Sequence, residues 1–160
     1  MALTKVDTSM IESSGAFGRR NIFINGDFSI YQRAQQITGI GANASTYYTA
    51  DRWLLEPQNT SGRLTMTAGT EAAPTESNVT TSLKLDCTTA DTSTAANEYM
   101  VLAQKVEGFD VQQFKKGTSG AKQFTLSFWV KSETTSHTFV AELFDQDNSR
   151  QISKTFAVTS

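Results

Sequence analysis

The chain of 160 residues has a single cysteine, Cys87, only two prolines and a net charge of -2 at neutral pH. One cysteine excludes a disulfide within the chain, so stability must come from burial and hydrogen bonding. Because neither sign of charge is clustered, we expect no nucleic-acid groove and no polybasic membrane patch. No apolar run approaches the roughly 20 residues that span a bilayer, and the first residues lack the apolar core of a secretory signal. We therefore expect a protein made and folded in a cytoplasm, without membrane insertion.

Serine, threonine and phenylalanine are frequent in this sequence, and proline is scarce. Such a composition suits strands with hydroxyl-bearing outer faces better than it suits helices. The length is enough for one domain with a substantial core. We therefore predict an all-β fold in one domain.

Alternation of apolar and polar residues predicts strands along most of the chain. Residues 20–33 are predicted to form a strand, a turn at Asn25-Gly26, where positive φ is tolerated, and a second strand. Pro57 is expected to end the strand that begins at Asp51. The last two strands should form a hairpin around residues 145–149. Beyond the opening stretch, strands are predicted over residues 51–55, 62–68, 82–87, 98–106, 123–131, 137–144 and 151–158.

Polar segments over residues 34–46, 69–81 and 88–97 are predicted to be loops. One helical turn is expected over residues 109–117, because Val111 and Phe114 lie three residues apart and Gly117 follows as a stop.

The alternation also predicts which side chains lie in the core. Cys87 should be buried and inert on the face of its strand that carries two leucines. Trp129 should face away from the core. The residues predicted to be buried include Leu64, Met66, Leu83, Leu85, Phe124, Leu126, Phe128 and Val130.

Three short motifs then suggest a family: Asn21-Ile-Phe-Ile-Asn-Gly-Asp-Phe28, Tyr48-Thr-Ala-Asp-Arg-Trp53 and Thr125-Leu-Ser-Phe-Trp-Val-Lys-Ser132. With these motifs in this order, the chain resembles phage tail-fibre and virion structural proteins. Their folded part is similar to the jelly-roll carbohydrate-binding modules of polysaccharide hydrolases. The resemblance implies a jelly-roll β-sandwich over residues 19–160, preceded by an extended N-terminal arm over residues 1–18. Since a jelly roll usually has about eight strands, the sandwich is expected to be incomplete at its C-terminus and to belong to a longer fibre.

The arm carries four apolar side chains, Leu3, Val6, Met10 and Ile11, before a linker-like segment over residues 13–18. A disordered tail is the ordinary interpretation of such a terminus. The resemblance implies instead that these four residues dock on other tail or baseplate proteins of the virion, and that the fibre is a homotrimer. A short apolar edge of this kind suits a groove on a partner.

No catalytic set is visible in the sequence, and we expect no enzyme. His137 is the only histidine and lies in a Ser/Thr-rich turn, so no serine–histidine–aspartate arrangement is favoured. Asp145 and Asp147 are spaced as in a calcium loop, but Arg150 stands where that loop needs glycine.

The only cofactor to be considered is a structural calcium, which the resemblance implies near the first strand. Asn25 and Asp27 offer oxygen ligands beside the turn there. Ser29, however, stands where the related hydrolase modules commonly have an acidic residue.

The aromatic residues that could stack on a sugar ring are Trp129, Tyr47 and Tyr48. Contact with a neighbouring subunit is the other interpretation of the same residues. Trp53 is expected in the core, with Asp51 and Arg52 pairing or capping beside it.

The expected function is that of a structural component of a phage tail fibre on the virion. It would attach through its N-terminus and lead to a host-recognition region, with a host-surface glycan as a further partner. The alternative is a carbohydrate-binding module of a polysaccharide-degrading enzyme.

Overall fold

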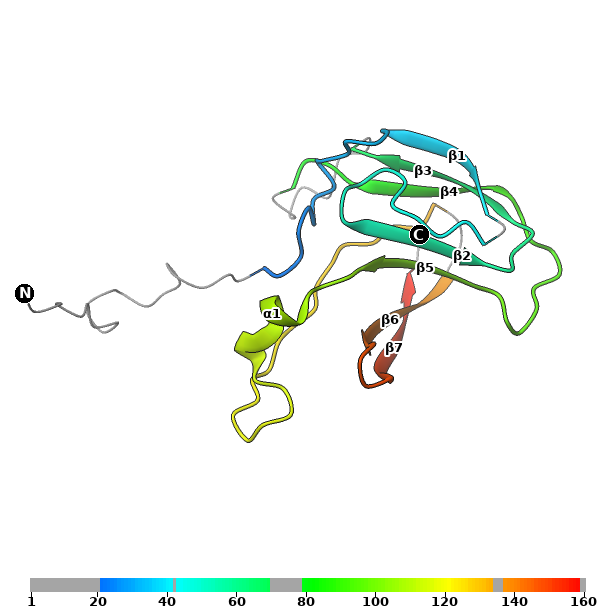
Figure 1. The fold of residues 1–160 in the computed structure, drawn as a ribbon. Coiled ribbons are helices and arrows are strands. Elements are labelled where there is room, and N and C mark those ends of the chain that lie inside the picture. Colours follow the sequence, from blue (N-terminus) through cyan, green and yellow to red (C-terminus); the bar gives the residue numbers. More distant parts are fainter. Residues whose placement is uncertain (1–20, 42, 70–78, 134–136, 159–160) are drawn as a thin grey trace, which may run out of the picture. The chain divides into compact units, whose positions relative to one another are not determined.

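The computed structural model describes residues 21–41, 43–69, 79–133 and 137–158 (Figure 1). The predicted arm, with Leu3, Val6, Met10 and Ile11, lies outside the described residues. The chain divides into two compact units, Met1–Gln123 and Phe124–Ser160. Strands dominate both units, so the all-β prediction is confirmed. Within the described ranges, no helix is long and apolar enough to cross a membrane.

The first unit contains two antiparallel sheets (Figure 1). Its strands are β1 (Gln36–Ile40), β2 (Trp53–Gln58), β3 (Arg63–Ala68), β4 (Leu83–Thr89) and β5 (Tyr99–Gln104). One sheet has the order β1-β3-β4, and the other pairs β2 with β5. The strands predicted for β3, β4 and β5 are therefore confirmed.

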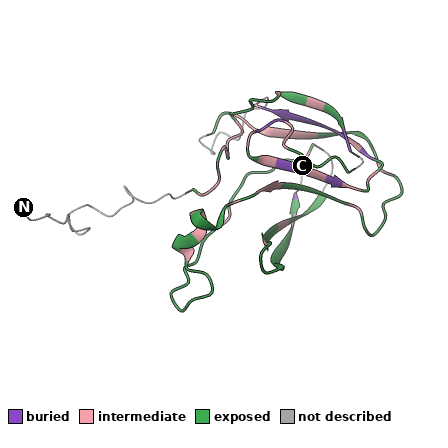
Figure 2. Ribbon diagram, in the orientation of Figure 1, coloured by how far each residue is buried: buried purple, intermediate pink, exposed green. Residues whose placement is uncertain are grey.

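The core of this unit draws on both sheets, and burial is concentrated on β2 and β3 (Figure 2). Leu55 on β2 and Met66 on β3 are fully buried. The predicted burial of Leu64 and Met66 is confirmed. The buried cluster is Ile40, Leu55, Leu64 and Met66, and Ile37, Tyr48, Leu83 and Leu85 pack against it.

The sequence predicted that Pro57 ends its strand, and this prediction is wrong. Pro57 lies inside β2. The N–H and the carbonyl of Leu55 both bond to Thr46, on the side away from β5. Two residues later, the nitrogen of Pro57 points to that same side. No hydrogen bond to β5 is lost there, so the strand tolerates a proline.

The predicted helical turn is confirmed as α1 (Gly108–Val111) followed by a short 3-10 helix, η3 (Gln112–Phe114). Lys115 ends it in the left-handed region with φ 50°, and its N–H bonds to the Gln112 carbonyl. Gly117 then turns the chain with φ 80°.

The second unit contains one antiparallel hairpin, β6 (His137–Asp145) and β7 (Arg150–Val158), as predicted. Asp145 closes the turn: its carboxylate accepts hydrogen bonds from the backbone and side chain of Asn148 and pairs with Arg150 at 3.1 Å. The side-chain bond from Asn148 and the Arg150 guanidinium lower the pKa of Asp145. Phe139 lies opposite Phe156 with stacked rings 5.8 Å apart.

The strand predicted over residues 123–131 is wrong, because none of these residues is in a strand. Phe124, Phe128 and Val130 are exposed, and Leu126 is only partly buried. Phe128 packs edge-on against Phe156 at 5.5 Å. Alternation specifies which side chains share a face, but it supplies no partner strand, and a strand needs one.

Two further predictions from the sequence are wrong. Residues 20–33 contain no strand in their described part, 21–33, although a turn at Asn25 closes with a bond from Phe28 N–H to the Asn25 carbonyl. Residues 34–46 are not all loop, since β1 lies within them. A bulge lies between Ile37 and Ile40, and Gly39 within it has φ 71°. The bulge interrupts the alternation of apolar and polar residues from which β1 could have been predicted.

Cys87 is exposed rather than buried, which corrects the prediction made for its strand. It lies opposite Leu64 in the β3–β4 ladder, but β4 is the edge strand of its sheet. From Asp86 onward this strand is exposed, because the core does not extend to its C-terminal half.

Candidate functional site

The loop around Asn25 is held together by a side-chain amide rather than by strand pairing. We call residues 24–30 the Asn25 loop. The Asn25 Oδ1 accepts the Ile30 N–H at 3.0 Å, and its Nδ2 donates to the Ile30 carbonyl at 2.8 Å and to the Asp51 carbonyl at 3.0 Å. Asn25 itself has φ 55°, a conformation that asparagine tolerates better than most residues. One amide thus closes the loop and ties it to the start of β2.

Aromatic packing fastens the Asn25 loop to Trp53, which is half-buried. The Trp53 Nε1 donates to the Asn25 carbonyl at 2.9 Å. The rings of Phe23 and Phe28 lie 5.8 Å and 5.1 Å from that of Trp53. Gln104 adds a second clamp, since its amide bonds to both the N–H and the carbonyl of Ile24 at 2.8 Å. The contact between the motif residues Asn25 and Trp53 therefore stabilises the Asn25 loop.

Asp51 pairs with Arg33 at 3.5 Å, and no pairing with Arg52 is found. The Asp51 carboxylate also accepts the Gln32 N–H at 3.3 Å. Arg52 is exposed with φ 72°, so its backbone turns the chain into β2.

The calcium predicted at Asn25 and Asp27 remains a prediction. The Asn25 oxygen already accepts the Ile30 N–H, and an Asp27 oxygen accepts the Ser29 N–H at 3.4 Å. Across the described ranges, no three His, Cys, Asp or Glu side chains come together as a metal site would require.

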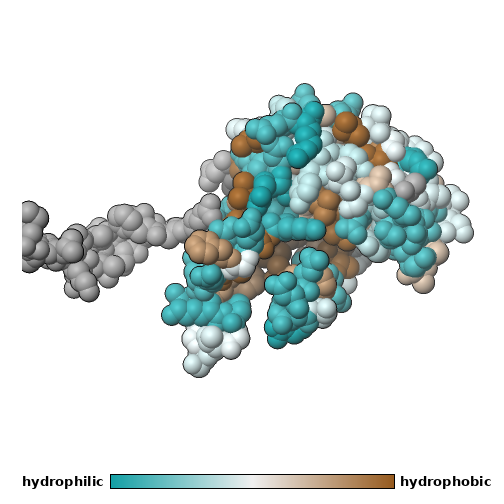
Figure 3. Space-filling view, in the orientation of Figure 1, coloured by the Kyte–Doolittle hydropathy of each residue, from teal (hydrophilic) through white to brown (hydrophobic). Residues whose placement is uncertain are grey.

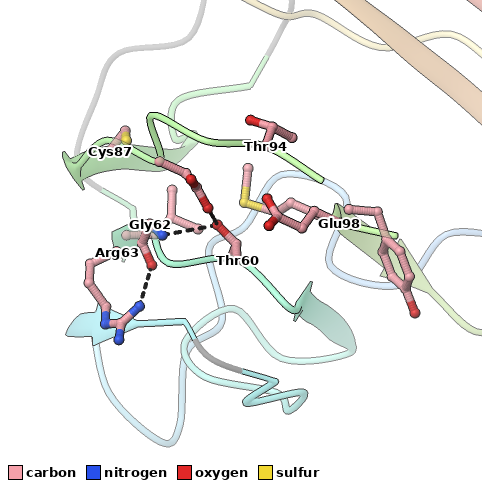
Figure 4. Close-up of a pocket in the computed structure, with 10 residues that line it drawn as sticks. Thr60, Gly62, Arg63, Cys87, Thr94 and Glu98 are labelled. Carbon is pink, nitrogen blue, oxygen red and sulfur yellow. Dashed lines mark hydrogen bonds between the residues drawn. The ribbon is translucent and has the colours of Figure 1, made fainter. Parts of the chain in front are cut away.

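A cavity of about 220 Å³ lies in the first unit, where β3, β4 and β5 meet the loops that precede β3 and β5 (Figure 4). Leu64 and Met100 contribute apolar surface to it, while Asp91 and Glu98 contribute carboxylates. Its remaining lining residues are Thr60, Gly62, Arg63, Cys87, Thr94 and Tyr99.

Asp91 shapes this cavity by fixing the loop before β3. Its carboxylate accepts the Ser61 N–H at 2.7 Å, the Thr60 hydroxyl at 3.0 Å and the Ser93 N–H at 3.0 Å. Thr60 in turn accepts the Gly62 N–H at 3.0 Å (Figure 4). The hydrogen bonds from Ser93 and Ser61 hold the pKa of Asp91 well below its usual range. Asp91 therefore stays charged near neutral pH and does not serve as a proton donor.

The cationic and phenolic groups of the cavity are engaged elsewhere. The Arg63 guanidinium donates to the carbonyls of Ser61 and Gly62 at 2.9 Å and 2.7 Å. The Tyr99 hydroxyl donates to Glu56 at 2.9 Å, and this bond raises the pKa of Tyr99. The cavity thus combines apolar side chains with polar groups that are mostly engaged in bonds within the chain.

The aromatic residues predicted to contact a sugar or a subunit have different surroundings. Tyr47 is half-buried, with the Arg33 guanidinium 5.8 Å above its ring. Tyr48 packs against the core, donates its hydroxyl to the Ala44 carbonyl, and has its pKa raised by burial. Trp129 belongs to the second unit and is 63% exposed. Of the three, Trp129 has the most accessible ring.

Thr60 and Asp91 were not singled out in the sequence, because they lie in ordinary polar segments between predicted strands. Glu98 was only the first residue of the strand predicted over residues 98–106. The signal that was available is the spacing Asp91-Thr-Ser93, which is typical of an aspartate that bonds to the backbone two residues on.

Comparisons with protein-family models, with curated proteins and with solved structures find no match for this chain.

Proposed function

We propose that this chain is a non-enzymatic structural component of a phage tail fibre, in which a jelly-roll β-sandwich over residues 19–160 forms part of a longer, homotrimeric fibre. The three motifs quoted above support the family. The observation that carries the proposal is the amount of apolar surface left exposed on β5 and on the β6–β7 hairpin.

Strand β5 exposes four consecutive large side chains, Tyr99, Met100, Val101 and Leu102, each between 36% and 50% accessible. Neighbouring residues of a strand point to opposite faces, so apolar groups are accessible on both faces of β5. Contiguous apolar surface of this kind marks an interface more often than a free surface.

The β6–β7 hairpin repeats this feature in the second unit. Phe139 and Leu143 lie on one face, opposite Phe156 and Ile152, while Val140 and Phe144 lie on the other face. All except Phe156 are exposed, and Ile152 is 70% accessible. Apolar residues also reach the molecular surface in the space-filling view (Figure 3). Neighbouring protomers of a fibre would cover such faces, because burying one large apolar side chain contributes about 1.5 to 3 kcal/mol.

Within this proposal, the arm over residues 1–18 attaches the protein to the tail or baseplate through Leu3, Val6, Met10 and Ile11. The protein is located on the virion and is made in the host cytoplasm. These parts of the proposal rest on the resemblance.

The experiment is to size the full chain by sedimentation equilibrium and to label phage particles with an antibody raised against it. The expected results are a species three times the chain mass and gold labels on the fibres. A double variant Val140→Ser/Phe144→Ser should shift the equilibrium toward the monomer, because both side chains are exposed in the single chain. The matched control is Thr155→Ser on the same face, opposite Val140. A chain that stays monomeric at high concentration, together with unlabelled particles, would refute the proposal.

A carbohydrate-binding module is the second candidate, and the exposed ring of Trp129 is the observation that favours it. Planar aromatic side chains stack on sugar rings. Saturable binding of a polysaccharide by the monomer, lost in Trp129→Ala while the fold is retained, would favour this function over a fibre subunit.

A further inference from the structure

The sequence Asn25-Gly26 is the one place in the chain where glycine follows asparagine. In such a pair the backbone nitrogen of the glycine can attack the asparagine Cγ, because no β-carbon hinders its approach. The side-chain nitrogen leaves as ammonia and a cyclic imide forms. Water then opens the imide to aspartate or isoaspartate, so that asparagine and water give an acid and ammonia. Such a change is a spontaneous covalent modification of the chain.

The folded structure opposes this reaction at Asn25. Attack requires the Asn25 Cγ and the Gly26 nitrogen to reach a near-attack geometry, and it converts the planar amide into a tetrahedral centre. Three hydrogen bonds join the side-chain amide of Asn25 to the backbone of Ile30 and Asp51. They keep this amide planar and bonded to those residues, and therefore away from the attack geometry with the Gly26 nitrogen. The bond from Trp53 to the Asn25 carbonyl holds the backbone of the same residue.

We infer that Asn25 is a site of spontaneous deamidation that the fold protects, so that chains which lose the Asn25 loop are modified there and folded chains are not. Because the hydrogen bonds of the amide must break before the glycine nitrogen can attack, the reaction in the folded chain should be slower by about tenfold or more. The site is independent of the function proposed above.

The product would not fit the loop that the amide holds. A carboxylate at position 25 has no N–H groups to donate to the Ile30 and Asp51 carbonyls. It would place negative charge against two carbonyl oxygens that are now satisfied by Nδ2. Isoaspartate would in addition lengthen the backbone between residues 25 and 26. Modification therefore disfavours refolding of this loop. A modified residue 25 would identify chains in which the loop had opened.

The test compares the full chain in buffer with the same chain in guanidinium chloride at mildly alkaline pH. Mass spectrometry follows the gain of about 1 Da on the peptide that contains Asn25. The expected result is rapid conversion in denaturant and conversion slower by about tenfold or more in the native protein. Equal rates in the two conditions would overturn the inference.

Asn148-Ser149, in the exposed turn of the hairpin, provides an internal comparison in the same samples. Its side chain makes one hydrogen bond, to Asp145 at 2.8 Å, instead of three. Folding should therefore slow its deamidation less than that of Asn25. If folding slows both sites equally, the protection does not come from the bonds around Asn25, and the inference fails.

Gly26→Ala is the matched control variant. A Cβ at position 26 would meet its nearest atoms, on Asn21 and Phe23, at 3.9 Å, which is an ordinary contact, and φ at this glycine lies outside the left-handed region. The variant should fold, keep its far-ultraviolet spectrum and lose the fast reaction in denaturant. Fast conversion of Asn25 that persists in this variant would show that the glycine nitrogen is not the attacking group.

Discussion

Leu55 and Leu102 form a matched pair for testing where the core of the first unit lies. They are cross-strand partners in the β2–β5 ladder and share one face of it. Leu55 is fully buried, whereas Leu102 is 36% exposed. The same substitution, leucine to alanine, should therefore have different costs at the two positions.

The magnitudes follow from what each alanine removes. Leu55→Ala removes three carbons from a closed environment, which costs about 2.4 kcal/mol in transfer free energy, and the residual cavity brings the total to about 3 kcal/mol. At Leu102 part of the side chain already contacts water, so the cost should be about 1.5 kcal/mol, and water can enter the space left. In a chain of this size, about 3 kcal/mol corresponds to a fall of roughly 6 to 12 °C in melting temperature.

The assay is urea unfolding followed by the fluorescence of Trp53 in a Trp129→Phe background, so that the signal reports the first unit. Both variants and the parent should unfold with the same dependence on urea, which shows that only stability has changed. If Leu102→Ala costs as much as Leu55→Ala, or if Leu55→Ala costs less than about 0.5 kcal/mol, the placement of the core is wrong.

Three further predictions concern other parts of the chain. Deleting residues 2–16 should leave the melting temperature nearly unchanged and sharply reduce incorporation into particles; full fibre occupancy after the deletion would show that the arm is only a tail. The pKa of Asp91 is lowered in the folded chain, so its contribution to stability is present above its unfolded value of about 3.9 and is lost as pH falls below it. Asp91→Asn should therefore flatten the dependence of the urea midpoint on acid pH, and an unchanged dependence would contradict this. Iodoacetamide should alkylate Cys87 in the native protein, because its thiol is exposed. Labelling that occurs only in denaturant would show that the thiol is buried.

The elements that were correctly predicted are those specified by local sequence. In β3, Leu64 and Met66 alternate with threonines, and this alternation is enough to predict the strand and the burial of its two large apolar residues, although Thr65 and Thr67 are buried as well. The β6–β7 hairpin follows from two alternating runs around an aspartate-rich turn, and Asp145 closes that turn within five residues of its own position.

The two strands predicted over residues 20–33 do not form, because side chains bond to the backbone N–H and carbonyl groups that a neighbouring strand would otherwise pair with. Gln104 takes both polar groups of Ile24, and Asn25 takes both of Ile30. The alternation of apolar residues there is real, but it does not show that polar side chains will compete for the backbone. Gln104 lies 80 residues from Ile24, a separation that no local pattern encodes.

The cavity could not be predicted for a similar reason. Its walls come from three strands and two loops, and Asp91 reaches Ser61 across 30 residues of sequence. A single sequence gives the polar character of each loop, but not that the two loops meet. Trp129 is exposed as expected, but Phe128 and Val130 beside it are exposed as well, so the alternation from which its exposure was predicted is not the reason for it.

The position of Pro57 has a consequence for aggregation. A sheet edge with open N–H and carbonyl groups can template the addition of a strand from another molecule. On the outer edge of β2, Thr46 already occupies both polar groups of Leu55, and Pro57 has no N–H to offer. An incoming strand would find both groups of Leu55 occupied and no donor at Pro57, so regular pairing of another molecule along this part of the edge is disfavoured.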